Sequence, residues 1–264
     1  MPVITLKNAG HTYGKHIALS DVTLETRPQE LLGIIGPNGS GKSTLLKLMA
    51  GLLPASAGVV CLDGTDINEL RRDAVARRIS LAPQSAALPE LFTALDIVLM
   101  GRTPHLGLLR YESKGDIAIA CNALETTHTA HLAGKCINQL SGGERQRVVI
   151  ARAIAQEAGV LLLDEPTANL DVNYQVEIMN FLRLLCRDRD MTVVIALHDL
   201  NLASQYCHRL VMLKDGRVFS QGTPAEIITP PLIREVFGLD VYVGPHPVNG
   251  LPVTLVSGNN HNHG

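Results

Sequence analysis

One glycine-rich stretch, residues 36–43, has the residue types and spacing that bind phosphate. It reads G-P-N-G-S-G-K-S and matches the pattern G-x-x-x-x-G-K-[ST] between an apolar run and a helical pattern. Its glycines let backbone N–H groups point at a phosphate, and the following helix adds the positive end of its dipole. In such a loop Lys42 reaches the β- and γ-phosphates of a nucleotide and the Ser43 hydroxyl binds Mg²⁺. The residues predicted to contact the nucleotide here are Gly36, Pro37, Asn38, Gly39, Ser40, Gly41, Lys42, Ser43 and Thr44.

Two adjacent carboxylates, Asp164 and Glu165, follow the apolar run 160–163. Two carboxylates at the end of a buried strand repel one another, so a bound cation or a catalytic role usually accounts for their presence. Downstream of a phosphate-binding loop, the aspartate at this place holds Mg²⁺, often through water. Glu165 is placed to polarise an attacking water as a general base. The two motifs together therefore predict magnesium-assisted hydrolysis of a nucleotide.

A second phosphate-binding helix end is predicted at residues 140–144, which read L-S-G-G-E. Ser141 is a good N-cap candidate, and Gly142 and Gly143 leave the first N–H groups of the helix uncovered. One nucleotide needs only one phosphate-binding loop, so a second such element on the same chain requires an explanation. Two copies facing head to tail, each covering the nucleotide of the other, would supply it.

The elements that must position these residues alternate between strand and helix. Continuous apolar runs, typical of strands buried on both faces, occupy residues 31–35, 160–163 and 192–197. Shorter strands are predicted at 3–6, 22–25, 59–62, 79–82, 210–213 and 217–219, with turns at 8–10 and 63–64. Helical periodicity replaces these strands between residues 85 and 156. We therefore predict an α/β fold in which a helical subdomain is inserted.

The same pattern suggests where the parts of the chain begin and end. The ATP-binding α/β core is predicted over 1–84 and 157–222, the helical subdomain over 85–156, and a C-terminal extension over 223–264.

Composition and charge exclude several classes of function. The formal net charge of −2 gives no pull toward nucleic acid, and the five scattered cysteines argue against a disulfide framework. No signal peptide or run long enough to span a membrane is present, so we expect a soluble protein that reaches a membrane only through a partner.

The order and spacing of these motifs resemble those of the ATP-binding cassette family over nearly the whole chain. The presence of both LSGGE and a phosphate-binding loop in one chain is highly specific for this family. The resemblance implies a P-loop NTPase core with a mainly parallel sheet, an N-terminal antiparallel β subdomain, ATP and Mg²⁺ as ligands, and a homodimer. It also implies that Tyr13 stacks on adenine, that Gln84 touches Mg²⁺ and the attacking water, and that His198 contacts the γ-phosphate. The residues that it implies act on the nucleotide of the opposite subunit are Ser141, Gly142, Gly143 and Asp171.

A narrower likeness lies in residues 92–107, which read F-T-A-L-D-I-V-L-M-G-R-T-P-H-L-G. This stretch, together with 232–240 and 245–247, is similar to importer ATPases for iron–siderophore, haem or cobalamin uptake. The likeness implies that region 88–107 contacts an integral-membrane permease at the cytoplasmic face of a prokaryotic membrane, and that a substrate-binding protein takes part indirectly.

Other functions stay open at this point. Importers of molybdate or of zinc and manganese share parts of these motifs. A soluble cassette protein of DNA repair or of the ribosome, or a nucleotide-binding module without turnover, belongs to a different class. A segment that merely packs on the core would expose little apolar area over 88–107, whereas a docking surface would expose more.

Overall fold

The computed structural model describes residues 3–84, 86–106, 111–168 and 170–256 of the 264. Five parts of the predicted regions lie outside these residues: residues 1–2 and Asn169 of the predicted core, Ser85 and residues 107–110 of the predicted helical subdomain, and residues 257–264 of the C-terminal extension. Gly107, the last residue of the predicted permease contact, is among them.

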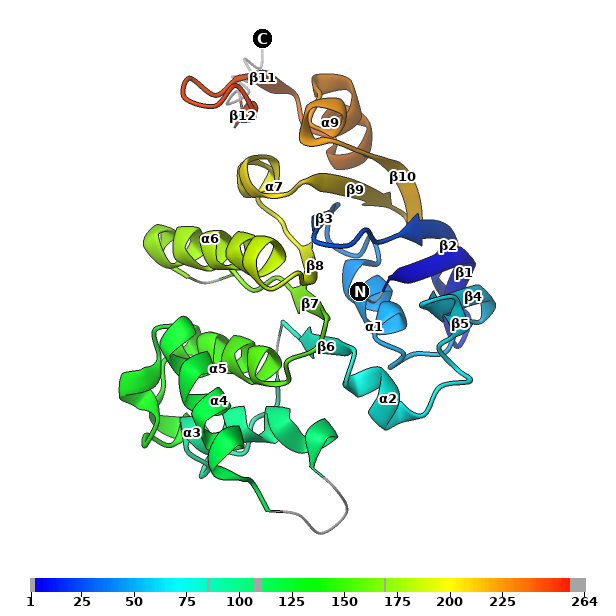
Figure 1. The fold of residues 1–264 in the computed structure, drawn as a ribbon. Helices are drawn as coiled ribbons and strands as arrows, with labels where there is room; N and C mark the ends of the chain where they lie inside the picture. Colours follow the sequence, from blue (N-terminus) through cyan, green and yellow to red (C-terminus); the bar gives the residue numbers. More distant parts are fainter. Residues whose placement is uncertain (1–2, 85, 107–110, 169, 257–264) are drawn as a thin grey trace.

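A six-stranded sheet with the order β10-β9-β3-β8-β7-β6 forms the centre of the molecule (Figure 1). The strands are β3 (Leu31–Ile35), β6 (Ile79–Ala82), β7 (Val160–Asp164), β8 (Thr192–Ala196), β9 (Arg209–Lys214) and β10 (Arg217–Gly222). Neighbouring strands pair in parallel except β10, which forms an antiparallel hairpin with β9. Every residue of β3, β7 and β8 is buried, as expected for strands covered on both faces. The predicted α/β fold with a mainly parallel sheet is therefore confirmed.

Alternate residues of the central strands belong to two separate hydrophobic cores. In β3, Leu32 and Ile34 pack against α1 (Lys42–Met49) and the N-terminal antiparallel sheet. Leu31 and Ile35 face the opposite core, which the helices of the other side complete. Because side chains alternate along a strand, the apolar run of β3 supplies both cores at once.

The N-terminal antiparallel sheet has the order β2-β1-β4-β5. Its strands are β1 (Ile4–Tyr13), β2 (His16–Glu25), β4 (Ala57–Leu62) and β5 (Thr65–Asp66). The turn predicted at 8–10 is wrong, because β1 continues to Tyr13 and absorbs the irregular residues as shifts in register, with Asn8 at φ 48°. The turn predicted at 63–64 is confirmed and joins β4 to β5, with both residues at positive φ.

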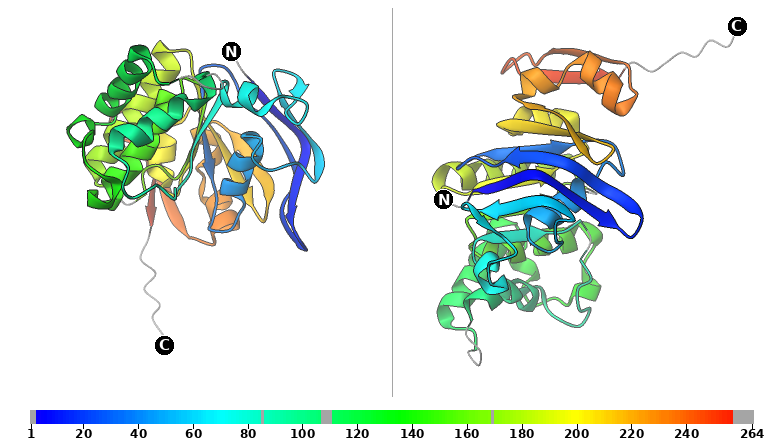
Figure 2. Two further views of the ribbon diagram at one scale, coloured as in Figure 1. Left: turned by 90° about the horizontal axis from the view of Figure 1, so that it is seen from below. Right: turned by 90° about the vertical axis from the view of Figure 1, so that its right-hand side faces the viewer.

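Helices dominate the segment from α3 to α5, at the lower left of Figure 1. These elements are α3 (Ala94–Leu99), η1 (Met100–His105), α4 (Lys114–Thr126), η2 (Ala130–Leu132), η3 (Ile137–Gln139) and α5 (Gly142–Ala155). Seen from below, this segment and the antiparallel sheet lie on opposite sides of the molecule (Figure 2). The helical character predicted for residues 85–156 is present, while the domain boundaries themselves stay predictions.

The remaining elements are α2 (Arg72–Ala76), α6 (Val172–Asp188), α7 (Leu200–Tyr206), α8 (Pro224–Ile227), α9 (Pro230–Phe237), β11 (Val241–Pro245) and β12 (Pro252–Val256). Of these, α6 and α7 pack against the central strands β3 and β8 (Figure 1). The β11–β12 hairpin is tied to α7, because Ser204 Oγ donates to the Pro252 carbonyl at 2.6 Å. No helix within the described ranges combines the length and the apolar character needed to cross a bilayer.

Gly33 in the middle of β3 offers a test of the packing between β3 and β9. A Cβ atom at this position would lie 2.6 Å from Leu210 Cδ2 and 2.7 Å from Cys207 Sγ. We expect Gly33→Ala to lower the free energy of unfolding by about 1–3 kcal/mol, as overpacked cores do. Urea titration of the two proteins measures the difference. Gly134→Ala is the control, because no heavy atom lies within 4 Å of its Cβ position. Equal losses in both variants would contradict this account of the packing.

Candidate functional site

The phosphate-binding loop joins the end of β3 to the start of α1, and the helix begins at Lys42 as predicted. Two of its glycines are required by close approach. A Cβ on Gly36 would lie 2.4 Å from the Leu213 carbonyl oxygen. Gly41 has φ 102°, and a Cβ there would lie 2.7 Å from Leu19 Cδ2. The loop is thus held between β9 and β2 in a conformation that other residues would strain.

Lys42 is buried inside this loop, with 5% of its surface exposed. Its Nζ donates to the carbonyl oxygens of Gly36 at 2.9 Å and Pro37 at 3.2 Å. Burial lowers the pKa of Lys42, and the nearby Glu165 and Asp164 carboxylates oppose that shift. An anion in the pocket would therefore meet a cation that has already lost much of its hydration.

Asp164 lies at the carboxyl end of β7, where its Oδ1 accepts a hydrogen bond from Ser43 Oγ at 3.1 Å. Burial is the main cause that raises the pKa of Asp164; the Ser43 hydrogen bond opposes it and the charge of Glu165 adds to it. Hydroxyl and carboxylate oxygens are the hard ligands that Mg²⁺ prefers. Ser43 and Asp164 lie side by side, and burial disfavours an unpaired carboxylate there. The two side chains therefore fit a magnesium ion.

Glu165 is the centre of the polar contacts in the site. Its Oε2 accepts from Gln84 Nε2 at 2.5 Å, and its Oε1 pairs with His198 Nε2. The three residues follow β7, β6 and β8, which are adjacent in the sheet. Because parallel strands end at the same edge, strands far apart in the sequence bring these three side chains together. Glu165 itself has φ 51°, an uncommon conformation for this residue type.

A pocket of about 630 Å³ opens over these residues. Its lining consists of Tyr13, His16, Ala18, Asn38, Gly39, Gly41, Lys42, Ser43, Thr44, Gln84, Glu165 and His198. Tyr13 lies at the rim, 46% exposed, with its ring edge-on to His11 at a centroid distance of 4.5 Å. The predicted residues Gly36, Pro37, Ser40 and Asp164 are not part of this lining.

Sequence reasoning missed His16 and Ala18 on β2. Tyr13 and His16 are opposite each other across the tight β1–β2 turn. That pairing was the available signal, since a residue paired with a predicted base-stacking aromatic must lie beside the same pocket.

The second predicted phosphate-binding element lies away from this pocket. Ser141 is the N-cap of α5, as predicted: its Oγ accepts from Glu144 N at 3.3 Å, and Glu144 Oε2 accepts from Ser141 N at 2.8 Å. The hydrogen bonds that the Glu144 carboxylate accepts from the Ser141 backbone and side chain lower its pKa. Ser141, Gly142 and Gly143, like Asp171 at the start of α6, are absent from the pocket lining. The structure therefore brings the first set of predicted residues together and leaves the second set outside.

Comparison with known proteins places this geometry in a family. Residues 19–168 match the family described as ABC transporter. The cobalamin import ATP-binding protein BtuD of Halobacterium salinarum is 46% identical over 88% of this chain, and the chain spans 58% of that relative. The ferric enterobactin transport ATP-binding protein FepC of Escherichia coli is 39% identical over 93% of this chain and 91% of its own. The hemin import ATP-binding protein HmuV of Pseudomonas aeruginosa is 41% identical over 96% of this chain and 99% of its own.

Solved structures agree with these sequence relatives. A metal-chelate type ABC transporter in an inward-facing conformation has a TM-score of 0.82 at 29% identity, over 97% of both chains. The cassette MJ0796, described as a dimer bound to ADP and phosphate after hydrolysis, has a TM-score of 0.75 at 33% identity. That match covers 83% of this chain and 98% of the other.

The raised pKa of Asp164 predicts how pH affects the stability of the protein without nucleotide or Mg²⁺. A carboxyl whose pKa is raised on folding costs stability once the pH exceeds its ordinary value, and costs nothing when it is protonated in both states. Asp164→Asn should therefore raise the free energy of unfolding at pH 7, with the gain vanishing toward pH 3. Urea titrations across this range measure it. A gain that is unchanged at pH 3, or a loss at pH 7, would contradict the burial account.

Proposed function

The chain belongs to the ABC transporter family, and from that premise we propose that it is the ATP-hydrolysing subunit of a membrane importer for a metal chelate. One observation carries the proposal. One pocket is surrounded by Lys42, Ser43, Gln84, Glu165 and His198. Together these residues supply the groups needed to cleave a phosphoanhydride, beyond those needed to bind one. The names of the relatives favour iron–siderophore, haem or cobalamin as cargo over molybdate, zinc or manganese.

The proposed reaction begins with ATP in the pocket, its adenine on Tyr13 and its phosphates over the loop N–H groups and Lys42. Mg²⁺, held by Ser43 and Asp164 with Gln84 nearby, would neutralise charge on the β- and γ-phosphates. Glu165 accepts a proton from water as the water oxygen bonds to the γ-phosphorus and the bond to the bridging oxygen breaks.

Gln84 and His198 already contact the two carboxylate oxygens of Glu165, so they hold the base in position. A binding-only module would have no need of a buried base held in this way. These contacts therefore favour a hydrolase over a nucleotide-binding module without turnover.

A homodimer explains the residues that the pocket leaves out. Ser141, Gly142, Gly143 and Asp171 lie on other surfaces of the same chain, so a second copy facing head to tail would bring them to the nucleotide. The helix end at Ser141 would then contact the γ-phosphate from across the interface. Phosphate charge would join the two copies, and its loss after hydrolysis would let them separate. The dimeric form of MJ0796 supports this arrangement.

The permease would bind at residues 88–106, which we call the docking segment. Three of its apolar side chains are exposed: Leu91 by 81%, Phe92 by 45% and Met100 by 38%. Apolar side chains gathered at one surface are typical of a contact with another protein. The relatives act in import, so a permease at the cytoplasmic face of a prokaryotic membrane is the proposed partner, with a substrate-binding protein beyond it. A soluble cassette protein has no use for this surface.

Substitution of the proposed base tests the reaction. We expect Glu165→Gln to lower ATP turnover by about 10²–10⁴-fold, the usual contribution of a general base, while ATP binding and ATP-dependent dimers persist. Phosphate release and size-exclusion chromatography with ATP measure the two effects. Lys42→Ala is the contrasting variant and should weaken ATP binding itself. Turnover that survives in Glu165→Gln would refute the assignment of the base.

The exposed apolar residues test the permease contact. We expect the tagged chain to co-purify with an integral-membrane permease from its own host in mild detergent. Leu91→Ser should reduce this co-purification at least about tenfold, since one buried leucine contributes roughly 1.5–3 kcal/mol. The matched control is Leu255→Ser, a leucine that is 57% exposed on β12. Identical recovery of the permease with Leu91→Ser and the wild type would count against the docking segment.

A further inference from the structure

The docking segment is hydrogen-bonded to the chain that leads into Ser141. Ala94 N donates to the Lys135 carbonyl at 2.9 Å, and Ile137 N donates to the Phe92 carbonyl at 2.9 Å. Two more backbone bonds, from Leu95 N to Ala133 O and from Asn138 N to Glu90 O, continue the pairing. Exposed Leu91 and Phe92 therefore lie on a strip of backbone that is tied to the residues just before the N-terminus of α5.

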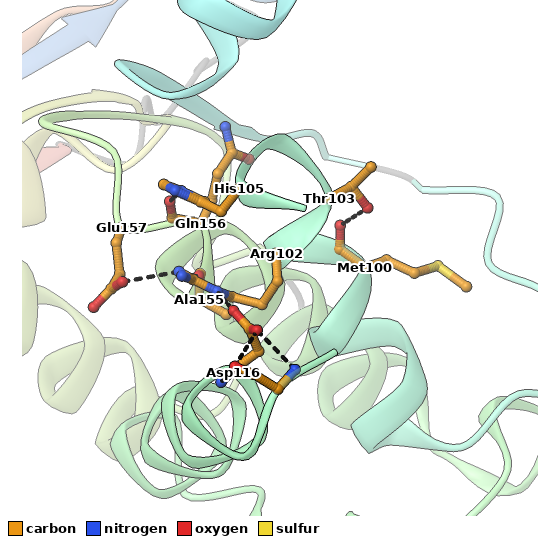
Figure 3. Close-up of polar contacts among 9 residues, drawn as sticks. Met100, Arg102, Thr103, His105, Asp116, Ala155, Gln156 and Glu157 are labelled. Atoms are coloured by element: carbon orange, nitrogen blue, oxygen red, sulfur yellow. Dashed lines mark hydrogen bonds and ion pairs between the residues drawn. The ribbon is translucent and has the colours of Figure 1, made fainter. Parts of the chain in front are cut away.

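The other end of the docking segment is held against the C-terminus of the same helix. A Cβ on Gly101 would lie 2.2 Å from the Arg152 carbonyl oxygen, so the backbones of η1 and α5 touch where only glycine fits. His105 Nε2 lies 2.8 Å from the Gln156 carbonyl oxygen (Figure 3). The segment thus contacts α5 at its C-terminus and contacts residues 133–138, which precede its N-terminus.

Arg102 completes the contact between the docking segment and the C-terminus of α5. It is 6% exposed, and its Nη1 donates to the Ala155 carbonyl at 2.7 Å, at the end of α5 (Figure 3). The same Nη1 pairs with Glu157 Oε2 at 2.8 Å, and Nε pairs with Asp116 Oδ1 at 2.9 Å. Asp116 also accepts from Ser113 in the capping box of α4. One guanidinium therefore joins η1 to α5 and α4.

The helix between the two contacts is suited to act as a stiff rod. It has 14 residues, and a helix of that length spans about 21 Å. Beyond Gly143 it contains no glycine and no proline, the residues at which helices bend. The docking segment is hydrogen-bonded to the chain on both sides of this rod, to residues 133–138 before it and to the Ala155 carbonyl at its end.

We propose that Arg102 is a positioning residue that holds the docking segment and α5 as one rigid body, so that displacement at the permease contact moves Ser141 at the opposite end of α5. The contacts of Arg102 do not depend on the proposed function, whereas the identity of the partner that displaces the docking segment rests on it. We expect lysine to be a poor replacement for Arg102, because an ammonium donates from one nitrogen at the end of a flexible chain, whereas the guanidinium donates from Nε and Nη1 in fixed directions.

Hydrogen exchange with mass spectrometry on the full chain, without nucleotide, tests the linkage. In Arg102→Lys we expect exchange at amides 137–145 to rise about tenfold, although these amides lie at the other end of α5. The control is Arg78→Lys, whose ion pair with Asp63 is exposed, and it should leave these amides unchanged. Faster exchange confined to residues 100–105, 114–118 and 153–157 would show local packing only and would overturn the proposal.

A second variant and a second readout keep the test decisive. If Arg102→Lys fails to fold, Glu157→Gln, at a half-exposed partner, should give a smaller rise at the same amides, and no rise there would overturn the proposal. In the complex purified with its permease, Glu157→Gln, a substitution outside the docking segment, should keep basal ATP hydrolysis and lose part of its stimulation by the permease. Equal loss of both activities would also overturn it. The exchange measurement needs no permease and no turnover, so a failure of the proposed function would not be mistaken for a failure of this inference.

Discussion

The site depends on charges that are buried before any nucleotide arrives. Lys42, Asp164 and Glu165 are each at most 8% exposed, at one edge of the central sheet. Taking charged groups out of water is unfavourable unless partners compensate, and here the partners are backbone carbonyls, Ser43, Gln84 and His198. Strands that are covered on both faces, especially β3 and β7, supply the stability that keeps such a site in place. The result is a pocket whose charged side chains are held in place by the protein.

Much of this arrangement was predictable, because the sequence signals were local. The loop from Gly36 to Ser43, the strand β3 and the cap at Ser141 each depend on residues next to one another, and the structure has all three. The contacts of Gln84 and His198 with Glu165 depend instead on strand order, which no local pattern states. Here the family resemblance supplied the positions, and the structure places them side by side.

The failures of prediction have physical causes as well. Residues 8–10 look like a turn because asparagine and glycine favour one, yet pairing with β2 on one side and β4 on the other keeps β1 extended. His16 and Ala18 belong to none of the sequence motifs and reach the pocket only through the register of β1 with β2. Arg102 likewise gave no signal: its role is visible only once α4, α5 and η1 are seen to meet (Figure 3).

The cap at Ser141 has a consequence for anion binding. Its Oγ accepts the Glu144 amide proton, and the Glu144 carboxylate accepts hydrogen bonds from the backbone and the side chain of Ser141. This capping box stabilises the start of the helix, but it also fixes a negative charge beside the amides of Gly142 and Gly143. The device that fixes the first turn therefore weakens the attraction of the same helix end for phosphate.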